Sequence, residues 1–152
     1  MGHDVGEPDT RSNAIVIRHG PVVELAEKFG VESWDDVGNH CQRRFDEYGC
    51  NHLFVDPIGV GQGGIAEYQA RGMTHLPVNF GEPPRGKKRM WLPSTRNADA
   101  FSMRNVQLAW VVKMRIENTR KAQNGEPIDP QKCMFINPDI ACLLYTSPSP
   151  RD

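Results

Sequence analysis

The chain has 152 residues, a length typical of one globular domain. Its hydrophobic content is 38% and its mean hydropathy is −0.56, and no apolar run approaches the roughly 20 residues that span a bilayer. The 18 Lys and Arg residues nearly cancel the 19 Asp and Glu residues, for a net charge of −1. Any binding to nucleic acid must therefore come from a local basic patch.

The N-terminus lacks the basic and apolar regions of an export signal, so we expect the four cysteines to be reduced thiols. None of them forms a CxxC pair. One grouping could be read as a zinc site, but its spacing is wider than zinc sites usually show; it consists of His40, Cys41, Cys50 and His52. The simpler interpretation is one buried thiol and two surface imidazoles.

The predicted elements begin with a short strand over residues 1–5, then strands at 14–18 and 22–25 that turn at His19–Pro21 into a hairpin. Ser33 is a suitable N-cap for a helix that runs to about Tyr48 and ends at Gly49. That helix has one apolar face, made by Val37, Cys41, Phe45 and Tyr48.

Further along the chain, the pattern predicts a buried strand at 52–56, a helix at 64–70 and a strand at 75–79, which Pro77 places at a sheet edge. A loop rich in proline and basic residues covers 82–97. A long helix follows from 99 to about 122, with Phe101, Leu108, Val112 and Ile116 on one side.

An antiparallel meander followed by alternating strands and helices indicates the α/β class, with a mixed sheet flanked by helices. If the strand at 52–56 lies parallel to the first strand and beside it, Asp4 and Asp56 emerge at the same sheet edge. Strands are about 4.8 Å apart, so the two carboxylates could share a metal ion, and oxygen ligands favour Mg²⁺ or Mn²⁺ over zinc. Two such ions can catalyse phosphodiester hydrolysis. The alternative is that Asp4 and Asp56 are turn acids, since aspartate is common where strands end.

Several stretches resemble the nuclease domain of phage terminase large subunits. Residues 1–20 resemble its opening strand and hairpin, Phe54-Val-Asp-Pro-Ile-Gly-Val-Gly61 its second acidic motif, and 75–81 the strand that follows. Residues 104–110 resemble a later helix more loosely, so the resemblance covers most of residues 1–120. It implies a ribonuclease H-like fold and a two-metal endonuclease that cuts concatemeric double-stranded viral DNA in the host cytoplasm.

In this family three acids hold the metals. Asp4 matches the first and Asp56 the second, Asp9 could assist the first or serve a turn, and no residue matches the third. The resemblance also implies an ATPase motor domain, the portal and the small terminase subunit as partners, and no membrane. We expect a domain fragment over 1–141, truncated at its C-terminus, with weak or no activity because the third acid is missing.

Residues 142–152 resemble a translated sequencing adapter, so we expect a disordered tail there. A basic cluster around an aromatic residue could contact DNA phosphates or could be a solvated loop; it consists of Arg85, Lys87, Lys88, Arg89 and Trp91. Two further hypotheses remain. Gly59–Gly64 matches GxGxxG and could bind a dinucleotide, although Asp56 to Ile58 separate the glycines from the strand and that strand is not the first of a βαβ unit. The chain could also be a non-catalytic packaging or interaction module.

Overall fold

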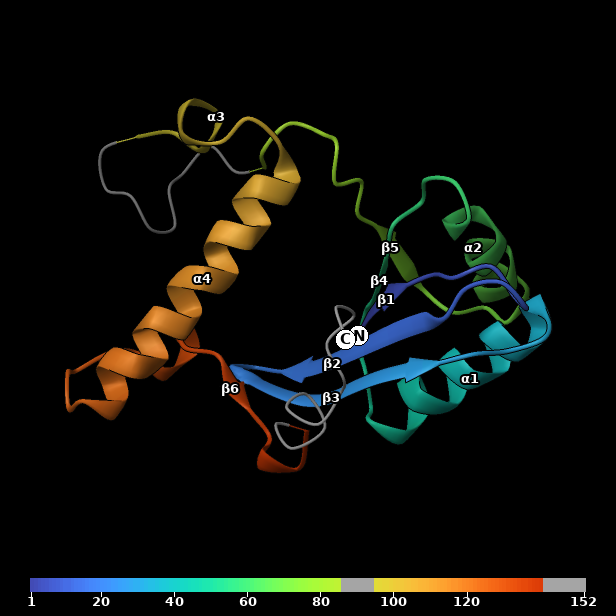
Figure 1. Ribbon diagram of the computed structural model, residues 1–152, viewed down its shortest axis with the longest axis horizontal. Helices are drawn as coiled ribbons and strands as arrows, with labels where there is room; N and C mark the ends of the chain where they lie inside the picture. The colour runs from blue at the N-terminus through green and yellow to red at the C-terminus, as the bar shows by residue number, and fades with distance from the viewer. Residues whose placement is uncertain (86–94, 141–152) are drawn as a thin grey trace, which may run out of the picture. The chain divides into compact units, whose positions relative to one another are not determined.

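The computed structural model describes residues 1–85 and 95–140 (Figure 1). These form two compact units, one comprising Met1–Val78 with residues 135–140, the other Asn79–Met134. The proposed tail lies outside the described residues, as do Lys87, Lys88, Arg89 and Trp91 of the basic cluster. No helix in the described ranges is long and apolar enough to cross a membrane.

The first unit contains a six-stranded sheet in the order β5-β4-β1-β2-β3-β6. Its strands are β1 (Gly2–Asp4), β2 (Asn13–His19), β3 (Val22–Phe29), β4 (Leu53–Val55), β5 (His75–Pro77) and β6 (Phe135–Ile136). Strands β1 to β3 are antiparallel, whereas β4 runs parallel to β1, β5 to β4 and β6 to β3. The predicted mixed sheet is confirmed, and Pro77 lies in an edge strand as expected.

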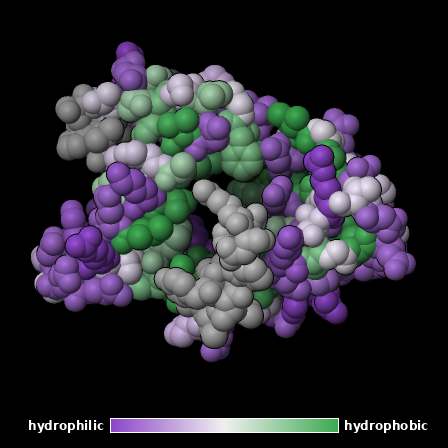
Figure 2. Space-filling model, in the orientation of Figure 1, coloured by the Kyte–Doolittle hydropathy of each residue, from purple (hydrophilic) through white to green (hydrophobic). Residues whose placement is uncertain are grey.

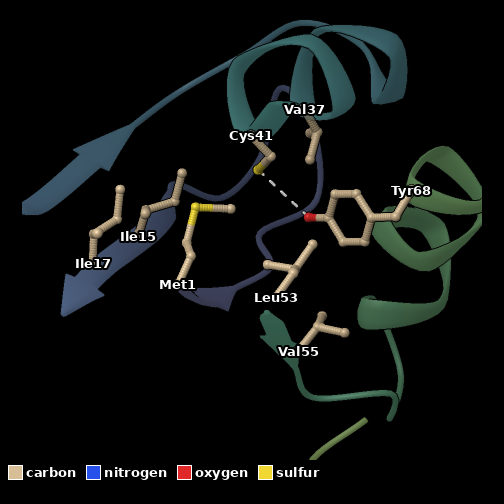
Figure 3. Packing of buried hydrophobic residues seen from close by; sticks show 8 residues of the cluster. All are labelled: Met1, Ile15, Ile17, Val37, Cys41, Leu53, Val55 and Tyr68. Carbon is tan, nitrogen blue, oxygen red and sulfur yellow. Dashed lines mark hydrogen bonds between the residues drawn. The ribbon is translucent and has the colours of Figure 1, made fainter. Parts of the chain in front are cut away.

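Two helices cover one face of this sheet, α1 (Trp34–Glu47) and α2 (Gly61–Ala70). Ser33 caps α1 as predicted, because its hydroxyl accepts a hydrogen bond of 3.1 Å from the Asp36 N–H. The apolar face of α1 and Tyr68 of α2 pack on inward-facing strand residues (Figure 3). The main members of this core are Met1, Ile15, Ile17, Val37, Cys41, Leu53, Val55 and Tyr68.

The core also contains a polar network centred on His3 of β1. The imidazole Nδ1 is hydrogen-bonded to the Tyr68 hydroxyl, and Nε2 lies 3.1 Å from the Asn13 side-chain oxygen. That oxygen also accepts a 3.0 Å bond from the Gly6 N–H. Burial lowers the pKa of His3 to about 4, despite the hydrogen bond to Asn13. The network therefore holds β1 with a neutral imidazole.

The buried imidazole of His3 should make the stability of the fold depend on acidic pH. The folded-state pKa of His3 lies below its unfolded value of about 6.5, so the unfolded chain binds a proton first as the pH falls. Its contribution to stability should be lost between about pH 6.5 and 4, by about 3 kcal/mol in total. Urea unfolding in EDTA should show a weaker loss over this range for His3→Gln than for wild type. His52→Gln, at an exposed position, is the control, and parallel curves for wild type and His3→Gln would contradict the account.

The second unit contains α3 (Asn97–Ala100), α4 (Arg104–Gln123) and the short 3-10 helix η1 (Pro130–Lys132). The prediction of one helix from 99 was wrong, because Met103 is extended, with φ −146° and ψ 165°, and α4 begins after it. Arg104 is held there by a 2.8 Å bond from its N–H to the Glu82 carbonyl and by an ion pair with the Glu82 carboxylate. The predicted apolar side of α4 is exposed; it carries Leu108, Val112 and Ile116.

Candidate functional site: a carboxylate pair at the ends of β1 and β4

The strand pairing brings Asp4 and Asp56 together. In the parallel pair β1–β4, Gly2 lies opposite Phe54 and His3 opposite Val55. Continuing this register by one residue places Asp4 opposite Asp56, which directly follows β4. Adjacent strands are about 4.8 Å apart. The predicted parallel pairing of the two strands is therefore confirmed, whereas the sharing of a metal ion by the two carboxylates stays a prediction.

Both acids belong to the sheet face opposite α1 and α2. His3 and Val55 are buried in the core, and because side chains alternate along a strand, Asp4 shares the other face with Gly2 and Phe54. Asp4 is exposed and Asp56 is half-buried. The neighbouring row on this face is apolar and partly exposed, with Leu76, Phe54 and Val16.

Neither carboxylate has a cationic partner among residues 1–85 and 95–140. The Asp56 carboxylate accepts one hydrogen bond, 3.1 Å from the Ile58 N–H, in a local turn that fixes one of its oxygens. The ion pairs of the first unit lie elsewhere, on Glu27, Asp35, Glu47 and Glu67. Two adjacent carboxylates with no counter-ion repel one another, and this arrangement suits a divalent cation.

A close backbone approach fixes the turn after Asp56. A Cβ on Gly61 would lie 1.8 Å from the carbonyl oxygen of Asp56, so only glycine fits there. Gly63 likewise faces the Trp34 ring, 2.5 Å from where its Cβ would be. These contacts let α2 begin at Gly61, three residues before the predicted start.

We expect Gly61→Ala to destabilise the ligand-free protein, because its methyl group must displace backbone rather than a flexible side chain. The expected loss is about 2 kcal/mol or more in urea unfolding. Gly30→Ala is the matched control, since nothing lies within 4 Å of the added carbon. Equal stability of the two variants would show that Gly61 and Asp56 are not in contact.

The dinucleotide hypothesis needs one correction. The prediction that the strand before the glycines is not the first of a βαβ unit was wrong, because β4, α2 and the parallel neighbour β5 form one. The spacing and chemistry still oppose the hypothesis. The second glycine of such a motif opens space for a pyrophosphate, whereas at Gly61 the Asp56 carbonyl occupies that space.

Asp9 lies in the turn between β1 and β2, with φ 62°. Its N–H donates a 3.1 Å hydrogen bond to the Val31 carbonyl, which gives it a clear turn role. No three His, Cys, Asp or Glu side chains form a metal-binding group in the described ranges. Asp139 follows β6, three strands from β1, which is about 14 Å across the sheet. A role for Asp9 in metal binding stays a prediction.

The possible zinc grouping and the basic cluster can also be compared with the structure. His40 stacks on Phe29 with ring centroids 3.9 Å apart and lies 3.1 Å from the Glu27 carboxylate. Cys41 is buried, and burial raises the pKa of its thiol to about 11, so it is a poor zinc ligand. Of the basic cluster, Arg85 is described: its N–H donates to the Gln107 side chain at 2.9 Å and its guanidinium lies 3.9 Å from Glu82.

This architecture, three antiparallel strands continued by parallel β4 and β5 with helices on one face, defines a ribonuclease H-like fold. Solved structures agree. The chain superposes with a TM-score of 0.77 and 20% identity on a lysine-to-alanine mutant of the nuclease domain of the large terminase subunit gp2 of bacterial virus Sf6, with manganese and β-thujaplicinol. Another structure of that domain gives 0.73 and 20%, and a mutant with calcium gives 0.71 and 21%.

Each superposition covers 91% of this chain and 62% of the other, so the chain spans less than two thirds of the domains it matches. No protein-family model and no curated protein matches the sequence. At this level of identity the likeness establishes the fold. The chain has the ribonuclease H-like fold of the terminase nuclease domain, as the sequence resemblance implied.

Proposed function

We propose that the chain is the nuclease part of a viral DNA-packaging terminase, a metal-dependent endonuclease that hydrolyses phosphodiester bonds of concatemeric double-stranded DNA. The observation that supports this proposal is the β1–β4 register, in which His3 lies opposite Val55, the residues directly before Asp4 and Asp56. A nuclease role also fits the fold shared with the Sf6 nuclease domain.

Asp4 and Asp56 are the residues that would hold the metal. Their donor set consists of carboxylate oxygens without a neighbouring cation in the described ranges, which fits Mg²⁺ or Mn²⁺. The Sf6 domain has been solved with manganese and with calcium. Bound divalent ions supply Lewis-acid chemistry, activating water and stabilising the leaving oxygen of a phosphodiester. The chain's own contribution is orientation: the Ile58 N–H fixes one Asp56 oxygen, and the core network fixes the strand that carries Asp4.

On the same basis the proposal includes an ATPase motor domain, the portal and the small terminase subunit as partners of the full protein, acting in the host cytoplasm. Because no three candidate ligands gather in the described residues and no residue matches the family's third acid, cleavage by this chain should be weak. Metal binding is therefore the first property to test.

Titration calorimetry with Mn²⁺ should detect a site that Asp56→Asn weakens by about tenfold or more, at least the cost of losing a supporting residue around a metal. The variant should remain folded, because an amide oxygen can still accept the Ile58 N–H bond. Plasmid nicking should require Mg²⁺ or Mn²⁺ and should be lost in the same variant.

Asp46→Asn is the control: it removes the same charge from an exposed position on α1 and should leave both properties unchanged. Equal Mn²⁺ affinity of the two variants would remove the metal assignment. A folded chain that binds no metal and never cuts would favour the non-catalytic packaging module.

A further inference from the structure

The net charge of the chain is close to zero, but its positive and negative residues are unevenly distributed along the sequence. Residues 79–134 contain 11 Lys and Arg residues and 5 Asp and Glu residues, against 7 and 14 in the rest of the chain. This segment is also a compact unit in space. The unit of residues 79–134 therefore has an excess of six positive charges, and the remainder an excess of seven negative charges.

Most acids of this unit are already neutralised within it. Glu82 pairs with Arg104, Asp99 with Arg96 at 2.8 Å, and Glu117 with Lys113 at 3.6 Å. Asp129 uses its carboxylate to cap η1, accepting the Gln131 N–H at 2.9 Å. Lys87, Lys88 and Arg89 lie outside the described residues. Among the described residues, the cations of this unit that have no ion pair lie at the far end of α4. We call this surface the basic end of α4 and define it as Arg115, Arg120, Lys121 and Lys132.

Hydrogen bonds join the last turns of α4 to the segment that carries Lys132. Arg115 donates to the carbonyls of Gln131 and Cys133 at 2.8 and 3.0 Å, and the Asn118 side chain donates to the Lys132 carbonyl at 3.0 Å. η1 therefore lies along the last turns of α4. Arg120, Lys121 and Lys132 are exposed, and Figure 2 shows hydrophilic residues gathered over this end of α4.

Helix stabilisation does not account for this much charge. A helix C-terminus is equivalent to about half a negative charge, which either Arg120 or Lys121 alone would offset. Glu126 and Asp129 border the same surface, and neither has an ion pair in the described ranges. Glu126 lies in a hollow of about 350 Å³ that Arg120, Lys121 and Asn124 also line. The four cations outnumber these two acids, so the surface retains a positive potential.

We propose that the basic end of α4 binds the phosphate backbone of duplex DNA without reading its sequence. The choice of DNA rests on the proposed function, whereas the preference for a polyanion follows from the charge alone. Exposed Lys and Arg side chains bind phosphates by releasing condensed counter-ions, so binding should weaken as salt rises. The carboxylate pair and the phosphate-binding surface then reside in different units of the chain.

The test compares two double variants of the full chain that lose the same charge. Arg120→Gln/Lys121→Gln alters the basic end of α4, and Arg11→Gln/Arg43→Gln alters exposed positions in the other unit. Binding to a fluorescent duplex is measured in EDTA, where no cleavage can occur. For the first variant the slope of log K against log salt should fall by about 1.8, since each phosphate contact contributes about 0.9. The second should keep the wild-type slope.

Equal slopes for the two variants would overturn the proposal, because the charge would then act globally. A second result would also overturn it: wild type forms a dimer in sedimentation, and Arg120→Gln/Lys121→Gln loses the dimer but binds DNA as before. The basic end of α4 would then bind the acidic part of a second copy of the chain. If Arg120→Gln/Lys121→Gln does not fold, Lys132→Gln tests the same surface with an expected fall of about 0.9. If the chain nicks DNA with metal but Arg120→Gln/Lys121→Gln keeps the wild-type salt slope, only the DNA-binding role of the basic end of α4 is refuted. If the salt slopes are as expected but the chain binds no metal, only the nuclease proposal is refuted.

Discussion

The arrangement of the candidate site depends on the parallel pairing of β1 with β4. β1 has only three residues, yet it is fixed from several directions. The Phe54 N–H donates to the Met1 carbonyl at 2.9 Å, and the N-terminal ammonium donates to the His52 carbonyl at 2.8 Å. β2 pairs along its other edge. A slip of one residue in the pairing would turn His3 out of the core and Asp4 into it. The same register therefore buries the imidazole network and exposes the acid.

The turn after β4 couples the second acid to the helix that covers the core. Gly61 lies against the Asp56 carbonyl and α2 begins there, while Tyr68 of the same helix bonds to His3 beneath β1. One helix thus supports both strand ends from the buried side. Both acids belong to the opposite face of the sheet, and this support from below would help their carboxylates to hold a shared metal ion.

Local signals were enough to predict much of this arrangement. The Ser33 cap, the hairpin, the edge position of Pro77 and the two strand-end acids each depend on a few neighbouring residues. The features that were missed depend on distant contacts. β6 has two residues and exists because the Phe135 N–H reaches the Pro21 carbonyl at 2.8 Å and the Asn137 N–H reaches that of Val23 at 3.0 Å. Likewise, α4 begins where Glu82 holds Arg104, not where periodicity alone would start it.

The central claim is that Asp4 and Asp56 share a divalent cation, and the most direct measurement is an anomalous difference map from a crystal grown with Mn²⁺. The account predicts a peak between the two carboxylates, within about 2.0 to 2.6 Å of an oxygen from each. A map with no peak there, or with the carboxyl groups more than about 10 Å apart, would contradict it, because no ion could then bridge them.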